Sequence, residues 1–426
     1  MDNKLPLLVL FVFFSASLAV ILTAFNDSND TFEAAGSYAG ANVLLITLES
    51  VRQDHVGFYG YGRNTTPNID RIAMDSFVFT KAYSQAGWTL PSITSIFTSL
   101  YPNQHNVVFF NSSLPKDAET IASVLNRNGY STKAYATHVL LKNSRRLDKG
   151  FDDYDESILG IGHPREIHSS RELSDKLISA VEGSGKPFFV WAHYFDPHYW
   201  YLNHDGFYYG KTPLDRYDSE IAYMDYHLGR VFDFLEESGL MDDTIIILVA
   251  DHGEEFQDHG SAHHRTLYEE IVKVPFIIYL PARGGNVIDD CAVQHIDVMP
   301  TILGLLQIDL ESEYSGRNIF SDGMNCATPV FMERESVPDS PQKMKGIIYD
   351  DKKLIFTYSG EQIRKEFYDL SSDPSELESI YGVGSAEIEL AESLLNGYIL
   401  QNSSQPHDTV KLSDEAVKIL RDMGYM

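Results

Sequence analysis

The sequence predicts an α/β fold in which a large, mostly parallel sheet carries helices on both faces, followed by a small C-terminal α+β piece. Continuous apolar runs alternate with stretches of helical periodicity, which is the pattern of repeated βαβ units. From about Pro329 the pattern changes to short strands and turns, and a helical stretch ends the chain. A length of 426 residues, of which 43% are hydrophobic, is enough for a sizeable core.

Three of the apolar runs are expected to be strands buried on both faces of the sheet, because they lack alternating polar positions. They cover residues 42–48 (NVLLITL), 244–250 (TIIILVA) and 274–280 (VPFIIYL). Further strands are expected at 131–136 and 188–192, and helices at 120–128, 171–182 and 219–237.

Charge and cysteine content exclude several classes of partner and site. The formal net charge of −28 would repel a phosphate backbone, so nucleic acid is not an expected partner. Cys291 and Cys326 are the two cysteines, which excludes a thiol-built zinc site. They could form one disulfide outside the cytoplasm, or they could be free buried thiols.

The N-terminus is predicted to anchor the protein in a membrane. Leu5 to Phe25 contains no charged residue, and a helix of this length spans a hydrocarbon core of about 30 Å. An uncleaved anchor (residues 1–25) is favoured over a cleaved signal peptide, because no clear cleavage site follows. Residues 26–40 are expected to be a polar tether. Lys4 precedes the segment and acidic residues follow it, which predicts that the N-terminus lies inside and the rest of the chain outside the cytoplasm.

Two of the buried strands are followed directly by residues that bind metals. Glu49 follows the first run, and Asp251, His252 and Gly253 follow the second. Functional groups of open α/β sheets gather beyond the carboxyl ends of the strands, so these side chains are expected to meet. Carboxylates and an imidazole suit a divalent ion. The alternative for Asp251 is that it caps the next helix.

Thr89 lies in a segment that is expected to begin a helix, QAGWTLPSITSIFTSLYP at residues 85–102. Pro91 suits a first helical turn, and the alternative for Thr89 is that it merely caps the helix. A helix N-terminus also favours an anionic ester, and a hydroxyl beside a divalent ion has a lowered pKa. Thr89 is therefore a candidate nucleophile.

Several separate motifs resemble the sulfatase family of the alkaline phosphatase superfamily. They are NVLLITLESVRQDHVGFYGYGRNTTPNIDRIA, WTLPSITSIFTSLYPNQH, HYFDPH, ILVADHGEEFQDHG, TLYEEIVKVPFIIY, FYDLSSDPSE and LRDMGY, in this order along the chain. The resemblance implies an α/β/α sandwich with a large mixed sheet. It divides the chain into a catalytic domain (residues 41–328) and a C-terminal subdomain (residues 329–426). Members of the family cleave or transfer sulfate and phosphate esters through a covalent intermediate.

The resemblance also implies roles for individual residues. Glu49, Thr89, Asp251 and His252 would bind the metal, and Thr89 would be the nucleophile. His198 and His263 would contact the transferring group or protonate the leaving group, with His264 as an alternative to His263. His138 would contact the substrate. Arg52 and His105 match the family pattern, with structural roles as the alternative.

Two departures from the family pattern bear on the substrate. Sulfatases carry Cys or Ser in a C-x-P-x-R context that is oxidised to formylglycine, whereas residues 89–93 read TLPSI. Formylglycine is therefore not expected. In place of the usual first-strand Asp stands Glu49, and Glu with a Thr nucleophile resembles the phosphoglycerol and phosphoethanolamine transferases of the superfamily. A phosphoester is favoured as substrate. The alternatives are a true sulfatase and a non-catalytic, metal-stabilised binding protein.

The expected cofactor is a divalent ion, Mn²⁺, Zn²⁺, Ca²⁺ or Mg²⁺. One imidazole with oxygen ligands favours Mn²⁺ or Zn²⁺. The expected substrate is a small-molecule, glycan or lipid-linked ester, and the other expected partner is the lipid bilayer.

Overall fold

The computed structural model describes residues 38–160, 169–185, 187–261, 263, 266–321, 326, 328–336, 341–401 and 408–422. The expected membrane helix Leu5–Phe25 lies outside these residues, as does most of the expected tether. Among the described residues, no helix combines the length and the apolarity needed to cross a bilayer.

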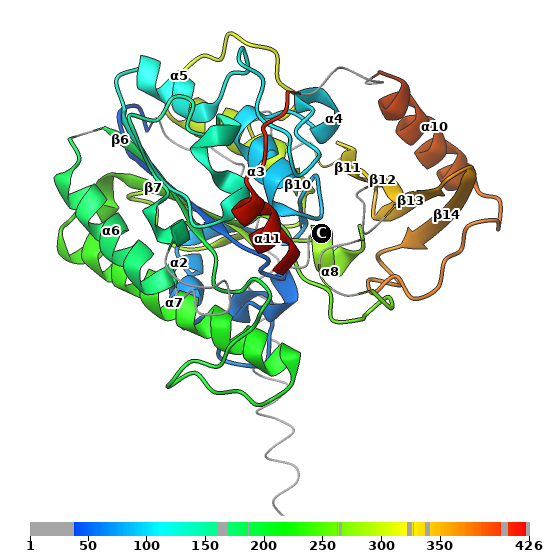
Figure 1. Ribbon diagram of the computed structural model, residues 1–426, viewed down its shortest axis with the longest axis horizontal. Coiled ribbons are helices and arrows are strands. Elements are labelled where there is room, and N and C mark those ends of the chain that lie inside the picture. Colours follow the sequence, from blue (N-terminus) through cyan, green and yellow to red (C-terminus); the bar gives the residue numbers. More distant parts are fainter. Residues whose placement is uncertain are drawn as a thin grey trace, which may run out of the picture.

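A mixed sheet of eight strands forms the centre of the molecule, in the order β5-β4-β6-β1-β7-β8-β2-β9 (Figure 1). The predicted mostly parallel sheet is confirmed; β8 runs antiparallel to both of its neighbours, β7 and β2. Its strands are β1 (Asn42–Leu48), β2 (Ser76–Phe79), β4 (Ser131–Tyr135), β5 (Asp153–Asp155), β6 (Phe188–Tyr194), β7 (Thr244–Ala250), β8 (Phe276–Tyr279) and β9 (Val287–Asp289). The short strands β3 (Ala82–Tyr83) and β10 (Val293–Gln294) pair separately.

The three central strands end level with one another. Every residue of β1, β6 and β7 is buried, which explains why their sequences are continuously apolar rather than alternating. Leu48 at the end of β1 is in register with Tyr194 of β6 and with Ala250 of β7. The residues that follow these strands therefore emerge at the same edge of the sheet.

Helices cover both faces of the sheet, as predicted. In Figure 1, α2 (Pro67–Ala73), α6 (Ser169–Gly183) and α7 (Pro213–Glu237) lie on one side, and α3 (Thr89–Thr98) and α5 (Ile121–Arg127) on the other. The remaining helices of this part are α4 (Pro102–His105), α8 (Glu269–Val272) and α9 (Val298–Leu305).

Helix α7 begins earlier than the sequence pattern predicted. The prediction started at residue 219, whereas the helix starts at Pro213. The Thr212 hydroxyl accepts a hydrogen bond from the Asp215 amide, and the Asp215 carboxylate accepts one from the Thr212 amide. This reciprocal cap, with proline in the first turn, stabilises additional polar helical turns at the N-terminus of α7. Apolar periodicity alone does not reveal these turns.

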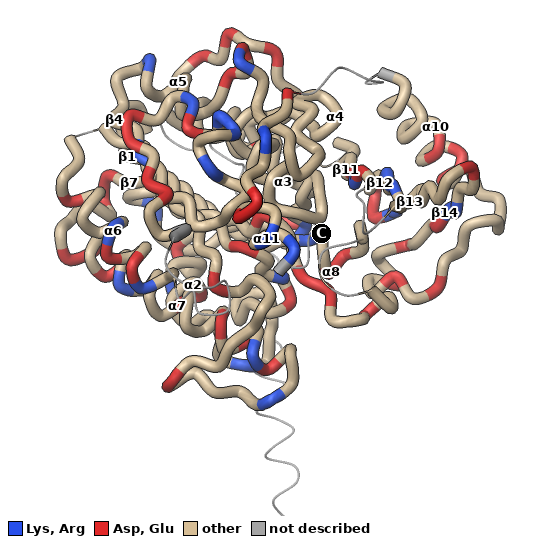
Figure 2. Tube along the Cα trace, in the orientation of Figure 1, with Lys and Arg blue, Asp and Glu red and all other residues tan. Residues whose placement is uncertain are grey.

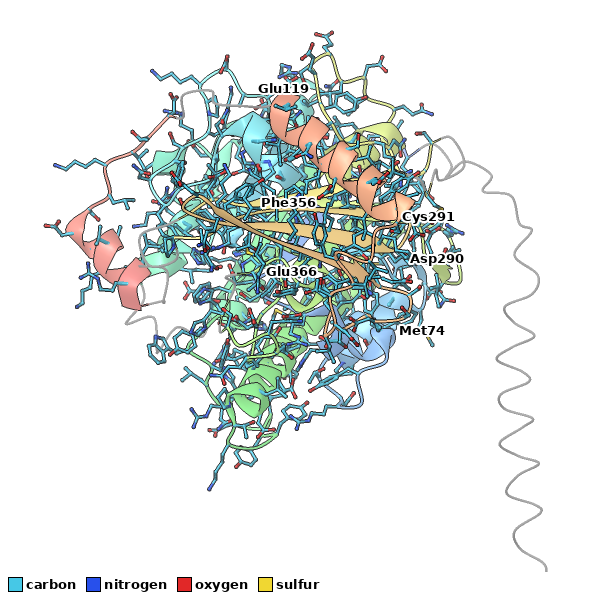
Figure 3. All side chains as sticks on the ribbon, turned by 90° about the vertical axis from the view of Figure 1, so that its right-hand side faces the viewer. Met74, Glu119, Asp290, Cys291, Phe356 and Glu366 are labelled. Carbon is cyan, nitrogen blue, oxygen red and sulfur yellow. A yellow bond between two sulfur atoms is a disulfide. The ribbon has the colours of Figure 1, made fainter. Side chains whose placement is uncertain are left out.

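The C-terminal part contains a four-stranded antiparallel sheet, as expected for a small α+β piece. Its strands are β11 (Val330–Arg334), β12 (Lys343–Tyr349), β13 (Lys352–Ser359) and β14 (Gln362–Asp369). Helix α10 (Ala386–Gln401) packs across β12 and β13, and Figure 3 looks onto this side of the molecule. The exact boundary at residues 328 and 329 stays a prediction.

The last described segment returns to the central domain. The Val410 amide donates to Asn111, and Leu420 of α11 (Asp414–Asp422) is fully buried in the main core. Helix α11 contacts the short 3₁₀ helix Val139–Leu141, which directly follows His138.

Cys291 and Cys326 form a disulfide, with Cα atoms 4.6 Å apart. Cys291 lies near the edge of the view onto the C-terminal sheet (Figure 3). Of the two possibilities left open by the sequence, the structure contains the disulfide and not the free thiols. Disulfides persist in oxidising compartments.

Acidic residues are spread over all parts of the traced chain rather than gathered in one place (Figure 2). This distribution agrees with the formal charge of −28.

Candidate active site

The edge of the sheet where β1, β6 and β7 end carries the predicted metal ligands. The Glu49 amide donates to the Tyr194 carbonyl over 2.9 Å, and the Asp251 amide donates to the Leu48 carbonyl over 3.1 Å. These bonds continue the ladders by one residue beyond each strand. Glu49 and Asp251 are thus held by the sheet itself, and both are fully buried.

Asp251 does not cap a helix, since residues 251–261 contain none. Its Oδ1 accepts hydrogen bonds from the amides of Ser50 (3.0 Å) and His252 (2.8 Å). Gly253 then lets the chain pass closely under Glu270: a Cβ at Gly253 would lie 1.9 Å from the Glu270 carbonyl oxygen. Only glycine fits this turn, which explains the Asp-His-Gly sequence.

Thr89 lies at the start of α3 with its hydroxyl directed at this edge. Its Oγ1 donates to Glu49 Oε1 over 3.0 Å and lies 3.4 Å from His252 Nε2. The helix cap is Trp88, which makes no side-chain capping bond, so Thr89 is not the cap considered from the sequence. The Thr89 hydroxyl therefore faces Glu49 and His252, beside backbone amides of the first helical turn.

The structure brings together the four residues predicted to bind a metal. His252 Nε2 lies 3.3 Å from Glu49 Oε1 and 3.5 Å from Asp251 Oδ2, and all four residues are fully buried. We call Glu49, Thr89, Asp251 and His252 the four-residue centre. Its roles in metal binding and catalysis stay predictions.

The chemistry of the four-residue centre fits a divalent cation. Asp251 Oδ2 is buried and has no hydrogen-bond partner among the residues that the structure describes. Burial, together with the charge of Glu49, raises the pKa of Asp251 to about 6. A cation between the two carboxylates would offset both the burial of their charges and the repulsion between them, because buried charges need pairing or a metal.

His252 is oriented to present Nε2 to the centre. Its Nδ1 donates to the Gly253 carbonyl over 2.8 Å. Burial lowers the pKa of His252, but Asp251 and Glu49 outweigh burial and raise the pKa to about 9. Without a metal, a proton on Nε2 thus balances the carboxylates. A divalent ion would replace that proton, as is usual when a histidine binds a metal.

Two of the predicted substrate-contacting histidines border the centre. Ligand atoms of Glu49, His138 and His198 all lie within 4.8 Å of one another. His138 Nδ1 accepts a bond from the Leu140 amide over 2.9 Å, so its proton is on Nε2; His198 Nδ1 donates to the Tyr199 carbonyl over 2.6 Å, so its Nε2 is an acceptor. Burial lowers the pKa of both side chains. The site therefore holds one neutral imidazole donor and one neutral acceptor.

His263 lies further out, on the loop that follows the Asp-His-Gly turn. Its ring is partly exposed and rests on the Tyr199 ring with centroids 4.2 Å apart, next to His198 in the chain. His264, the alternative to His263, lies outside the described residues.

Arg52 and His105 both contact other residues of the chain, and the choice between a family role and a structural role for each stays open. The Arg52 guanidinium binds Asp54 and Asp258 and donates to the Glu254 carbonyl. His105 lies 3.2 Å from the Ser95 hydroxyl and accepts a bond from the Val107 amide.

The sequence reasoning missed His193, whose Nε2 donates to Glu49 Oε2 over 2.7 Å. A signal was present, since a histidine near the end of an apolar strand (FFVWAHY) is unusual in a core. What could not be read was that β6 lies beside β1.

Comparisons with known families and proteins show what this chain is similar to. The Sulfatase family matches residues 41–308, and the family described as N-sulphoglucosamine sulphohydrolase, C-terminal, matches residues 257–397. An arylsulfatase of Clostridium perfringens is 23% identical over 437 aligned positions, which cover 80% of this chain and 90% of that protein. Lipoteichoic acid synthase 2 of Bacillus subtilis is 23% identical over 400 positions, covering 86% of this chain but 58% of that longer protein.

Among solved structures, a protein in complex with its substrate D-glucosamine-2-N,6-O-disulfate has the same fold, with a TM-score of 0.74 and 19% identity over 85% of this chain and 98% of that one. The Sulfatase match covers well over half of the chain and includes the whole four-residue centre. The chain therefore belongs to the sulfatase family of hydrolases.

Proposed function

We propose that this protein is a metal-dependent phosphoester hydrolase or phosphotransferase that works through a covalent intermediate on Thr89. One observation carries the proposal. The buried Thr89 hydroxyl lies within hydrogen-bond distance of Glu49 at the start of α3. The motif resemblance places Thr89 where the family carries its oxidisable residue.

The nucleophile decides between the two ester types. Thr89 Oγ would attack phosphorus, the bond from phosphorus to the ester oxygen would break, and the leaving oxygen would take up a proton. Glu49 Oε1, 3.0 Å away, is an acceptor for the threonine proton. Water or an acceptor alcohol would then attack the phosphorus of phosphothreonine and release Thr89. A threonine sulfate lacks the exit that a formylglycine hydrate has, so it would need attack at sulfur.

The neighbouring histidines have complementary tasks in this scheme. The Nε2–H of His138, whose Nδ1 accepts from the Leu140 amide, would donate to a non-bridging phosphoryl oxygen. His198, whose Nδ1 donates to the Tyr199 carbonyl, would accept a proton from the incoming water or alcohol at Nε2. His263, on its outer loop, would protonate the leaving oxygen.

Glu49, Thr89, Asp251 and His252 would hold the ion, which would lower the pKa of the Thr89 hydroxyl and neutralise phosphoryl oxygens. Of Mn²⁺, Zn²⁺, Ca²⁺ and Mg²⁺, the first two suit this donor set best.

A sulfuric ester hydrolase is the second candidate. The family match and the arylsulfatase relative support it. Lipoteichoic acid synthase 2 supports the phosphoester instead. These relatives suggest a glycan or lipid-linked ester as substrate. A site of action at the cell envelope is supported by the disulfide and by the apolar segment Leu5–Phe25.

A substrate panel tests the proposal. The purified protein is assayed with p-nitrophenyl phosphate, bis-p-nitrophenyl phosphate and p-nitrophenyl sulfate, with Mn²⁺ and with EDTA. We expect metal-dependent turnover of a phosphate ester and a phosphorylated Thr89 peptide in mass spectra of the quenched enzyme. Turnover of the sulfate alone would favour the second candidate, and binding of metal without any turnover would favour a binding protein.

A further inference from the structure

His193 is held between a metal-ligand candidate and a buried hydroxyl. It is fully buried near the end of β6, in register with Thr47 of β1. Its Nε2 lies 2.7 Å from Glu49 Oε2, and its Nδ1 lies 2.8 Å from Thr47 Oγ1. The ring therefore connects Thr47 of β1 with Glu49, the residue that follows Leu48 at the end of this strand.

The partners of Thr47 determine which nitrogen of His193 carries the proton. The Trp191 indole N–H, which can only donate, points at Thr47 Oγ1 over 3.0 Å. The Thr47 side chain is fully buried, so its own proton needs an acceptor, and His193 Nδ1 is at hydrogen-bond distance. Nδ1 then accepts, and the ring proton is on Nε2, facing Glu49.

We infer that His193 is a positioning residue for Glu49 and not a metal ligand. Its ligand atoms lie within 4.8 Å of those of Glu49 and Asp251, which by distance alone would allow coordination. If a cation replaced the Nε2 proton of His193, the ring would be left with no proton, because its Nδ1 accepts from Thr47. His252 differs, since its Nδ1 keeps a proton that it donates to the Gly253 carbonyl, and histidine binds metals as a neutral ring. Trp191, Thr47 and His193 form a chain of donors that ends on Glu49 Oε2.

The consequence concerns the other oxygen of Glu49. Oε1 is the atom that contacts Thr89 (3.0 Å) and His252 (3.3 Å). Glutamate has one more rotatable bond than the aspartate usual at this position in the family, so its carboxylate needs a partner to fix it. His193 supplies that partner. Outer partners of this kind typically change metal affinity 10- to 100-fold.

This inference rests on the proposed function, because it assumes that Glu49 binds a metal. Mn²⁺ affinity is measured by calorimetry on the metal-free full-length protein and its variants. We expect His193→Leu to weaken Mn²⁺ binding about 10- to 100-fold. His193→Gln, whose amide can still donate to Glu49, should retain most of the affinity. Thr47→Val should weaken Mn²⁺ binding less. The variant removes the hydroxyl that donates to His193 Nδ1, so the ring proton is no longer fixed on Nε2, but the imidazole itself remains.

His204 provides a matched control, because it also pairs with a buried carboxylate, that of Glu220. His204→Leu should leave Mn²⁺ affinity unchanged. If His193→Leu does not fold, His193→Gln and Thr47→Val carry the test.

The tautomer is read separately from ¹⁵N shifts of His193 in the metal-free protein, which should show an unprotonated Nδ1. Unchanged Mn²⁺ affinity in His193→Leu, or a protonated Nδ1, would overturn the inference. Wild-type protein that binds Mn²⁺ but cleaves no ester would sink the proposed function and leave this inference standing. Wild-type protein that binds no Mn²⁺ would overturn both.

Discussion

The site has two halves that are built differently. The strand-borne half consists of Glu49, His193, Asp251 and His252, all fully buried at the ends of β1, β6 and β7. Their positions follow from ladder hydrogen bonds between strands that are far apart in the sequence. The backbone that carries these side chains cannot shift without opening the central sheet.

The loop-borne half follows Gly253 and carries His263, which is partly exposed. Side chains rather than strands hold this loop. Glu255 accepts bonds from the His259 and Ser261 amides, and the His259 ring lies 2.7 Å from Glu270 and stacks on Tyr268.

His259 Nε2 also donates to the carbonyls of Ser375 and Glu376, which belong to the C-terminal part of the chain. The comparison of the two halves teaches that metal binding and substrate contact should be separable. A change in the loop should alter turnover but leave metal binding intact, and a change at the strand ends should alter both.

The largest effect is expected for Thr89→Ala. Loss of the nucleophile should lower kcat on the order of 10⁴-fold, because no covalent intermediate can form. Mn²⁺-dependent stabilisation should largely remain, since three ligands are untouched. Steady-state kinetics and thermal unfolding check the two parts, and Thr89→Ser, which keeps a hydroxyl, is the control. Substantial activity in the alanine variant would remove Thr89 from the mechanism.

Replacement of the bordering histidines should have the next largest effect. His138→Ala and His198→Ala should each lower kcat by about 10²- to 10³-fold, the range of a lost proton donor or acceptor. His263→Ala should cost less with an activated p-nitrophenyl ester, because that leaving group needs little protonation. A comparison of phenyl and p-nitrophenyl esters measures this difference. Equal losses with both esters would argue against His263 as the acid.

Metal removal should change the thermal stability of variants in the two halves differently. A ligand present at 100 times its Kd stabilises the folded state by about 2.7 kcal/mol, so EDTA should lower the Tm of the wild type. EDTA should lower the Tm of the His263→Ala variant by as much as it lowers the Tm of the wild type. In the Asp251→Asn variant, EDTA should lower the Tm little or not at all, because one of the two carboxylate charges that attract the cation is gone. If EDTA lowers the Tm of Asp251→Asn as much as that of the wild type, the ion binds at another site.

The smallest effect is expected at His259. Burial lowers its pKa, but the hydrogen bond to Glu270 outweighs burial and raises the pKa to about 9. The unfolded value is about 6.5, so the stabilisation from this ion pair is fully present below pH 6.5 and is lost as pH rises through 9. The Tm difference between wild type and His259→Gln should therefore shrink between pH 6 and pH 10. A difference that stays constant over this range would contradict the assignment.

Much of the site could be predicted because its chemistry follows local sequence features. Continuous apolar runs identified β1 and β7, and the first polar residues after them were Glu49, Asp251 and His252. Thr89 was readable from the proline and helical pattern that follow it, although the cap proved to be Trp88. His193 was not readable, because its role depends on the neighbour of its strand.

The sequence by itself determined which segments are buried strands, which residues follow them and which residue is the candidate nucleophile, since hydrophobic periodicity and residue chemistry are local properties. Only the tertiary structure decided that β6 lies beside β1, that β8 runs antiparallel, that Cys291 meets Cys326, and which groups the Nδ1 atoms of His138 and His198 contact. The physical reason is that strand order and hydrogen-bond partners join residues far apart in the chain, and periodicity along the chain carries no record of those pairings.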